Sequence, residues 1–194
     1  MKKIFLILFF FNLTYNSVHA ISPEIFVQST VNRASQILSK SISKEEKMDQ
    51  LKAIAKETVD IKGVGFYSLG SARKNMSDKE KIQYFDLFEN YFLKSFSSRL
   101  SEYTNPKIEV TGNKVLNKNY TIVNSLLVSS SERPEVKIDW RIYTKNPNNP
   151  LIRDLIIEGI SLARTQKEEF NSILNSNDGN IDALYEALEK FTKN

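Results

Sequence analysis

The sequence predicts an α+β fold, with helices packed on one face of a four-stranded antiparallel sheet. Three observations support this prediction. Apolar residues recur at helical spacing over the first hundred residues, a period of two replaces this spacing after Lys107, and helical spacing returns after Gly159. A sheet of this kind buries one face on its helices and leaves the other partly in water.

Residues 1–20 have the features of a cleavable secretory signal peptide. Lys2 and Lys3 supply the positive start, residues 4–11 are all apolar, and Val18 and Ala20 place small residues just before a cleavage point. A membrane anchor is the alternative, but the apolar run is far shorter than the ~20 residues that cross a bilayer. We therefore expect export, cleavage near Ala20, and a single mature domain over residues 21–194.

The composition excludes several kinds of chemistry. The chain has no cysteine, so it has no disulfide, no thiolate metal site and no cysteine-linked lipid anchor. Its one histidine, His19, lies in the predicted signal peptide. Loss of Lys2 and Lys3 lowers the formal charge from +4 to +2, and the remaining basic residues are interleaved with acidic ones. This pattern argues against nucleic acid as a partner, and no metal or cofactor is expected.

Local capping signals set the beginnings of the first helices. Ser22 precedes a proline and an acid, and capping boxes begin at Ser43 and Ser77. A short apolar segment, residues 61–69, ends at Gly70. The helix after Ser77 is the longest, and its apolar face carries mostly aromatic residues, namely Ile82, Tyr84, Phe85, Phe88, Tyr91, Phe92, Phe96, Leu100 and Tyr103.

The strands follow. Residues 136–143 alternate strictly between apolar and polar side chains, which makes them the clearest strand. The other strands are expected at 107–116, 120–128 and 151–158, with turns at Gly112–Asn113, 129–134 and 146–150. Two helices, about 161–175 and 181–191, close the chain, joined by the turn residues 176–179.

Gly159 and Ser161 lie between a strand and a helix, as in a hydrolase nucleophile elbow. A nucleophilic serine needs a base, and the mature chain has no histidine. We therefore favour the simpler interpretation that Gly159 permits a tight turn and Ser161 caps the helix. Asp154 and Glu158 share one face of the strand, where they would form an ion pair or satisfy backbone groups rather than act as an acid–base pair. No catalytic residue is expected.

Four segments occur in a distinctive order and spacing: residues 66–70, the aromatic ladder from Tyr84 to Leu100, residues 136–142, and residues 154–162 followed by Phe170. Together they resemble the MlaC, or toluene-tolerance, family of periplasmic phospholipid-binding proteins. The resemblance covers nearly the whole mature chain. Its most specific segment is Asp-x-x-x-Glu-Gly-x-Ser-Leu, beginning at Asp154.

The resemblance implies a cone-like carrier with an apolar cavity. Such a protein shuttles phospholipid through the periplasm between an outer-membrane lipoprotein complex and an inner-membrane ABC transporter, and so maintains the lipid asymmetry of the outer membrane. It needs no cofactor. We expect a monomer. The candidate lipid-binding residues are Phe66, Leu69, Phe85, Phe88, Phe92, Val136, Ile138, Trp140, Ile142 and Ile156.

The sequence leaves three alternatives open. The same aromatic and aliphatic residues would equally fill an ordinary core, and helical periodicity alone favours that interpretation. An isomerase- or dehydratase-like enzyme on a similar scaffold would need an acid or base deep in the pocket, such as Asp139 or Asp154. The alternation of residues 136–143 points Asp139 away from Trp140 and weakens this option. A plain adaptor for membrane proteins would have no cavity.

Overall fold

The computed structural model describes residues 21–130 and 134–193. The predicted signal peptide falls outside these residues, as does part of the expected turn at 129–134. Within the described residues, no helix is long and apolar enough to cross a bilayer.

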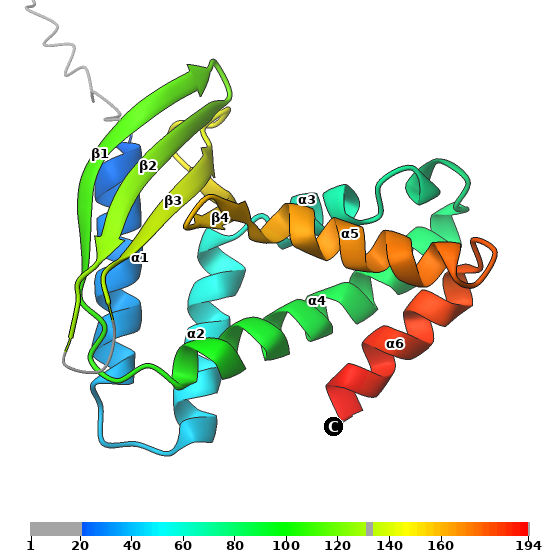
Figure 1. Cartoon of the computed structure of the whole chain (residues 1–194), viewed down its shortest axis with the longest axis horizontal. Helices are drawn as coiled ribbons and strands as arrows, with labels where there is room; N and C mark the ends of the chain where they lie inside the picture. The colour runs from blue at the N-terminus through cyan, green and yellow to red at the C-terminus, as the bar shows by residue number, and fades with distance from the viewer. Residues whose placement is uncertain (1–20, 131–133, 194) are drawn as a thin grey trace, which may run out of the picture.

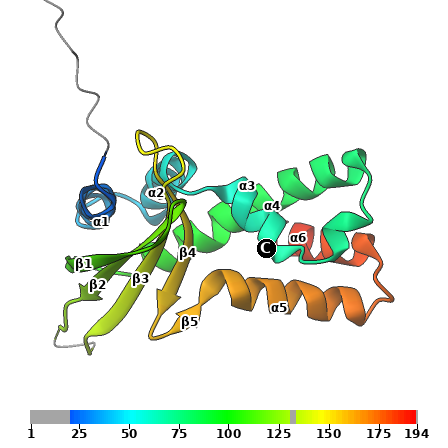
Figure 2. The same cartoon turned by 90° about the horizontal axis from the view of Figure 1, so that it is seen from above.

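The helices form two groups on either side of strand β4 (Figure 1). The first group consists of α1 (Pro23–Leu38) and α2 (Lys44–Thr58), which lie over one face of the sheet (Figure 2). The second group contains α3 (Ile61–Ser68), the short helix η1 (Ala72–Lys74), α4 (Asp78–Ser101), α5 (Leu162–Asn175) and α6 (Ile181–Lys193). It extends away from the sheet, except that the C-terminal end of α4 returns to pack on α2 (Figure 1). The expected α+β class, with helices on one face of the sheet, is confirmed.

The sheet is an antiparallel meander in the order β1-β2-β3-β4-β5. Its strands are β1 (Ile108–Asn117), β2 (Tyr120–Leu127), β3 (Val136–Tyr143), β4 (Leu151–Ile157) and β5 (Ile160–Ser161). The short fifth strand adds to the four that were predicted. It forms because the chain reverses at Gly159, where φ is +83°, and pairs with the end of β4 before entering α5.

One predicted turn is wrong. The chain does not reverse at Gly112 and Asn113, because β1 continues through both residues with a bulge beside Gly112. The reversal comes after Asn117, whose side-chain carbonyl accepts a hydrogen bond from the backbone N–H of Asn119 at 2.9 Å. An asparagine that satisfies the backbone two residues on forms a turn without a glycine.

The predicted helix starts are confirmed. Ser22, Ser43 and Ser77 are N-cap residues, and their hydroxyl oxygens accept from backbone N–H groups of the first turn. Both capping boxes are complete, because Glu46 and Glu80 also accept from the N-cap backbone. Each cap satisfies donors that the helix itself leaves unpaired.

Two large apolar clusters hold the described residues together. The sheet cluster packs α1 against one face of the sheet through Val27, Val31, Val123, Leu127, Ile138, Trp140, Ile142 and Ile152. The helical cluster joins α3, α4, α5 and α6 through Val64, Leu69, Met76, Tyr84, Phe88, Phe170, Leu174, Leu184, Tyr185 and Leu188. Val59, at the end of α2, packs against both clusters.

Strand β4 ties the two parts together. Ile152 accepts a hydrogen bond from the backbone N–H of Asp60 at 2.9 Å and forms a parallel bridge with Val59. The neighbouring Arg153 forms an ion pair with Asp60 at 2.6 Å, and its guanidinium lies 3.8 Å from the ring centroid of Tyr143. Asp60 also caps α3 by accepting from the N–H of Gly63.

The contact between α3 and α4 depends on Gly65. A Cβ atom at this position would lie 2.8 Å from Cδ1 of Phe88, a ring that is only 1% exposed. We expect Gly65→Ala to lower the free energy of unfolding by about 1–3 kcal/mol, because the buried ring must shift. Urea denaturation measures this. Lys62→Ala, on the exposed side of α3, is the control and should change it by less than about 1 kcal/mol. Equal effects would contradict the packing argument.

Candidate functional site

Eight of the ten predicted lipid-binding residues belong to the two clusters or pack against them, and Phe66 and Ile156 are the exceptions. Leu69 and Phe88 are buried in the helical cluster, and Phe85 and Phe92 pack against it. Phe66 contacts the ring of Phe85 edge-on, with centroids 4.3 Å apart. These five residues come from α3, the residue after it, and α4.

The sheet contributes the other candidates. Ile138, Trp140 and Ile142 alternate along β3 on the face that packs against α1, and Val136 borders the same cluster. The indole N–H of Trp140 donates to the hydroxyl of Ser125 at 2.8 Å. That hydroxyl donates in turn to the carbonyl of Ile138 at 3.0 Å. This chain of bonds satisfies the only polar atom of the tryptophan side chain inside an apolar cluster.

Ile156 lies on the opposite face of the sheet. It pairs with Asp139 on β3 and Ser161 on β5, whereas its neighbour Leu155 pairs with Trp140. Directly paired residues of antiparallel strands share a face. Leu155 therefore lies on the tryptophan face and packs against the sheet cluster, a position that the sequence analysis missed. The strand register, rather than the composition of β4, distinguishes the two residues.

A row of aromatic rings leads from the helical cluster along α4. Phe88 stacks on Phe92 at a centroid distance of 6.1 Å, and Phe92 stacks on Phe96 at 5.8 Å. Phe88 is buried, but Phe92 and Phe96 are only partly buried. The exposed fraction of the rings thus increases toward the C-terminal half of α4. Phe96 belongs to the predicted aromatic ladder but was not among the ten candidates.

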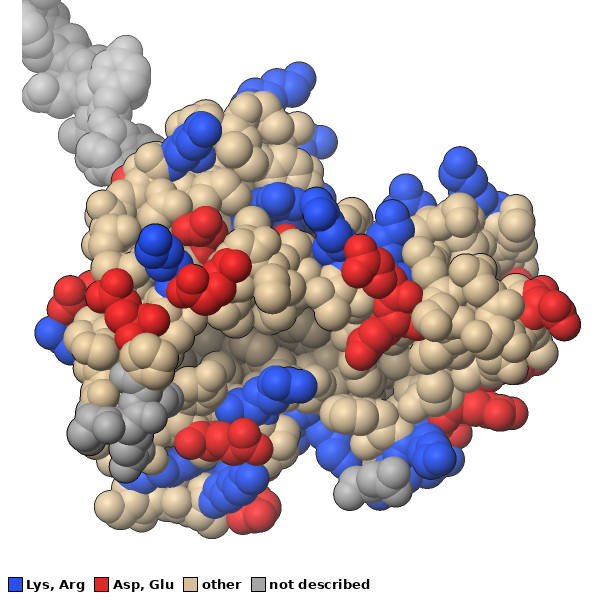
Figure 3. Space-filling model, viewed as in Figure 1, with Lys and Arg blue, Asp and Glu red and all other residues tan. Residues whose placement is uncertain are grey.

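The face of the molecule seen in Figure 3 is hollowed between the sheet and α5 on one side and α4 on the other. Lys, Arg, Asp and Glu side chains surround this hollow. Helix α4 packs on α2, α3 and α6, and α5 packs on α3, α6 and β4. The two clusters are therefore joined through neighbouring helices, and partly buried apolar residues pack against each of them.

Two further hollows fit a lipid poorly, because the first is small and polar or charged side chains line both. One, of about 240 Å³, lies between α3 and α4 and includes Phe85 and Phe88, but Lys62, Asp86 and Glu89 also line it. The other, of about 530 Å³, lies between α1 and the start of β1. Pockets for drug-sized ligands measure about 300–1,000 Å³ and are mostly apolar.

Comparisons with known proteins agree with the sequence resemblance. The model of the family described as MlaC protein matches residues 28–190. This chain belongs to the MlaC family. It is 23% identical over 202 residues to the intermembrane phospholipid transport system binding protein MlaC of Haemophilus influenzae, covering 98% of this chain and 93% of that protein.

A solved structure shares the fold. The phospholipid-binding protein from Ralstonia solanacearum, determined in complex with a phospholipid, superposes with a TM-score of 0.75 at 16% identity. The match covers 89% of this chain and 98% of the other. The MlaC fold therefore extends over nearly all of the described residues.

The most specific MlaC-like segment, which begins at Asp154, forms a local hydrogen-bond network at the β4–α5 junction. Asp154 is 6% exposed and accepts from the Ser161 hydroxyl at 2.6 Å and from the Ala163 N–H at 3.0 Å. The Ser161 oxygen accepts from the N–H of Arg164, so Ser161 caps α5 as predicted. Arg141 approaches Asp154 to 3.8 Å. Both expected roles of the Asp154 carboxylate are confirmed. It forms an ion pair with a basic side chain, Arg141, and it accepts a hydrogen bond from a backbone N–H group.

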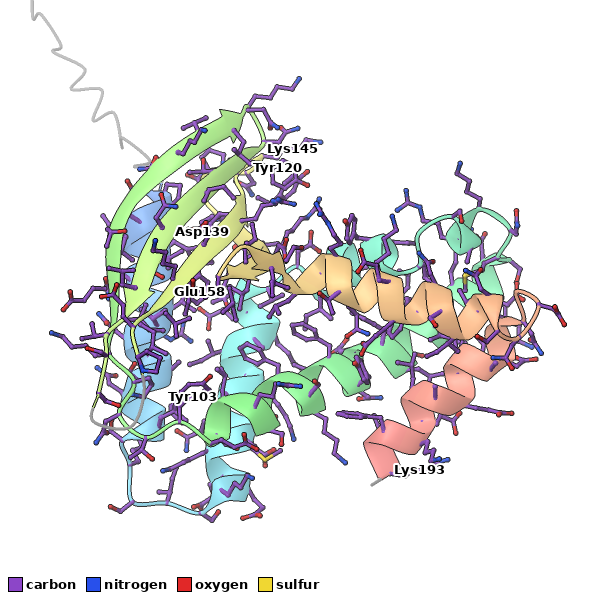
Figure 4. All side chains as sticks on the ribbon, viewed as in Figure 1. Tyr103, Tyr120, Asp139, Lys145, Glu158 and Lys193 are labelled. Atoms are coloured by element: carbon purple, nitrogen blue, oxygen red, sulfur yellow. The ribbon has the colours of Figure 1, made fainter. Side chains whose placement is uncertain are left out.

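Glu158 leaves the strand that was expected to contain it. It sits in the β4–β5 turn with φ of +49°, and its carboxylate accepts from the backbone N–H of Lys137 at 2.5 Å. Figure 4 shows Glu158 and Asp139 on the side of the sheet turned away from α1. Within residues 21–130 and 134–193, no three His, Cys, Asp or Glu side chains are grouped as a metal site would require.

Removing the carboxylate of Asp154 should destabilise the domain. Asp154→Ala leaves the buried N–H of Ala163 without an acceptor. We therefore expect the free energy of unfolding to fall by about 3 kcal/mol. Chemical denaturation followed by circular dichroism measures the change. Asp139→Ala is the matched control, because Asp139 is half-buried on the same face and bonds the Asn124 amide at 2.7 Å. If Asp139→Ala lowers the free energy of unfolding equally, the hydrogen bonds of Asp154 to the start of α5 do not explain the lost stability.

Proposed function

We propose that this protein is a periplasmic phospholipid carrier without catalytic activity. Its membership of the MlaC family over residues 28–190 is the observation that supports this proposal most. The phospholipid-bound protein that shares its fold points the same way. The predicted signal peptide fits an exported protein.

The physical task of such a carrier is to keep acyl chains out of water. Each CH₂ group that leaves water is worth about 0.8 kcal/mol, so a lipid with two long chains crosses an aqueous space only inside an apolar cover. The two clusters of this protein provide apolar surfaces on facing elements. The hollow between the sheet and α4 lies next to elements of both clusters (Figure 3).

We propose that the acyl chains lie between α4 and the sheet. Phe92 and Phe96 would contact them from the helix, and Val136 and Leu155 from the sheet, because all four are apolar and only partly buried. Trp140 and Phe88 would lie behind these residues.

The partners follow from the same proposal. A soluble carrier exchanges lipid with an outer-membrane lipoprotein complex and with an inner-membrane ABC transporter, and acts as a monomer. The similarity to a protein of the intermembrane phospholipid transport system of Haemophilus influenzae supports this assignment. A formal charge of +2 on the mature chain gives no reason to expect nucleic acid.

The geometry gives less support to an enzyme. An isomerase-like site needs an acid or base inside the apolar pocket, but Asp139 and Asp154 both lie on the sheet face opposite Trp140. Asp154 accepts hydrogen bonds from Ser161 and from the first turn of α5, and the one histidine of the chain, His19, lies in the predicted signal peptide and cannot activate Ser161 in the mature protein. Asp154 and Ser161 instead stabilise the β4–α5 junction.

Native mass spectrometry of the protein purified from cells tests the proposal directly. We expect co-purified phospholipid. Leu155→Asn should lower lipid affinity about tenfold or more, because it places an amide against the acyl chains. Ile156→Asn, one residue away on the opposite face, is the matched control and should keep its lipid. Protein that is always empty and accepts no lipid from vesicles would refute the carrier function.

The single tryptophan reports where the lipid binds. Phospholipids with brominated acyl chains quench indole fluorescence on close approach, so we expect the emission of Trp140 to fall when such lipids are loaded. A second protein with Trp140→Phe and Phe191→Trp places the indole on α6, where Phe191 is 41% exposed. Its emission should change little. Stronger quenching of the indole at position 191 than of the indole at position 140 would show that the lipid binds nearer to α6 than to the sheet.

A further inference from the structure

Strand β1 is the long open edge of the sheet within the described residues. At the other end of the sheet, β4 is covered by β5 next to Ile156 and Ile157, and by the backbone of Val59 and Asp60 next to Ile152. An exposed edge presents unpaired N–H and C=O groups that can pair with another chain. The way in which this protein closes its β1 edge therefore determines whether it associates.

A side chain of α1 takes the place of the missing neighbour. The Gln28 amide N–H donates to the carbonyl of Ile108 at 3.3 Å, and its carbonyl oxygen accepts from the N–H of Val110 at 3.2 Å. A residue in a parallel neighbouring strand makes the same pair of bonds, to the C=O of residue i−1 and the N–H of residue i+1. Gln28 thus satisfies the two outward groups that flank Glu109.

The amide is held in this orientation. Its N–H group also donates to the side-chain carbonyl of Asn32 at 2.9 Å. Further along, the Ser35 hydroxyl donates to the carbonyl of Pro106 at 2.8 Å, and the Asn113 amide bonds Glu24 at the other end. Polar side chains spaced along one side of α1 therefore follow the edge of β1.

The segment that Gln28 covers is the regular part of the edge. Bulges interrupt β1 beside Gly112 and again beyond Val115, and bulges hinder pairing between edges. Residues 108–110 precede both bulges. The groove of about 530 Å³ between α1 and the start of β1 also lies there, so α1 leaves the edge accessible if Gln28 swings away.

The start of β1 is complementary to itself. In antiparallel pairing of two copies centred on Ile108, Lys107 of each copy lies opposite Glu109 of the other. Opposite charges that face each other across strands are favourable. Within one chain Lys107 and Glu109 already form an exposed ion pair at 2.6 Å, so their side chains are free to change partners. A second copy of this chain is the partner that fits the edge.

We propose that Gln28 acts as a surrogate strand that closes the β1 edge and prevents a second copy from pairing with it. Loss of the amide exposes the outward groups of Ile108 and Val110, and two chains then join their sheets through antiparallel pairing centred on Ile108. This role is independent of lipid binding and would explain why we expect a monomer.

Sedimentation velocity over a concentration series tests this role. We expect Gln28→Leu to form concentration-dependent dimers while the unchanged protein stays monomeric. Gln36→Leu is the matched control, because it makes the same substitution at an exposed position of α1. Adding Glu109→Lys to Gln28→Leu places like charges opposite each other and should restore the monomer.

Amide hydrogen exchange provides a readout on the folded, unchanged protein. The N–H of Val110 should exchange slowly, and in Gln28→Leu at dilutions that keep it monomeric it should exchange about fivefold faster. Four results would overturn the proposal: a Gln28→Leu protein that stays monomeric at every concentration, association of Gln36→Leu to the same extent, dimers that persist with Glu109→Lys, or a Val110 amide that exchanges freely in the unchanged protein.

Discussion

Three consecutive residues of β4 connect the sheet to the second group of helices, and the remaining architecture depends on this connection. Ile152 bonds the backbone at the α2–α3 junction, Arg153 forms an ion pair with Asp60 beside it, and Asp154 caps α5. A bulge in the β3–β4 pairing accommodates Arg153 without a partner on β3. Three neighbouring residues of β4 therefore form the hydrogen bonds and the ion pair that hold both α3 and α5 against the sheet.

This connection leaves the two apolar clusters joined at one end. Val59 packs against both, but the surface is hollowed between the sheet and α5 on one side and α4 on the other (Figure 3). A protein that filled this space with its own side chains would gain stability, because buried apolar area is the main favourable term in folding. We interpret the incomplete packing as the consequence of carrying an apolar ligand, whose chains supply the missing contacts.

The polar residues of the chain serve the same architecture. Asp154 and Ser161 resemble catalytic groups in sequence, but their atoms are fully used in ending β4 and starting α5. Gln28, Asn32 and Ser35 are unremarkable in sequence, but they lie along the open edge of the sheet. In both places a side chain forms hydrogen bonds with backbone groups that regular secondary structure leaves unpaired. A backbone N–H or C=O group that is shielded from water and has no partner destabilises the fold.

Local signals in the sequence determined the helix starts, the strand alternation and the α+β class. Ser22, Ser43, Ser77 and Ser161 were predictable as caps because a cap acts on N–H groups two or three residues away. Residues 136–143 were predictable as a strand because side chains alternate between faces with a period of two.

Only the tertiary structure decided how distant segments meet. The bulge at Arg153 shifts the pairing of β4, so Leu155 and not Ile156 shares a face with Trp140, and no local pattern reveals that shift. The ten candidate residues were identified as apolar from the sequence, but which of them join either cluster depends on which elements pack together. Gln28 acts on groups 80 and 82 residues further along the chain. A contact at that separation exists only once the fold has brought α1 beside β1, because sequence patterns record the local spacing of side chains and not their distant neighbours.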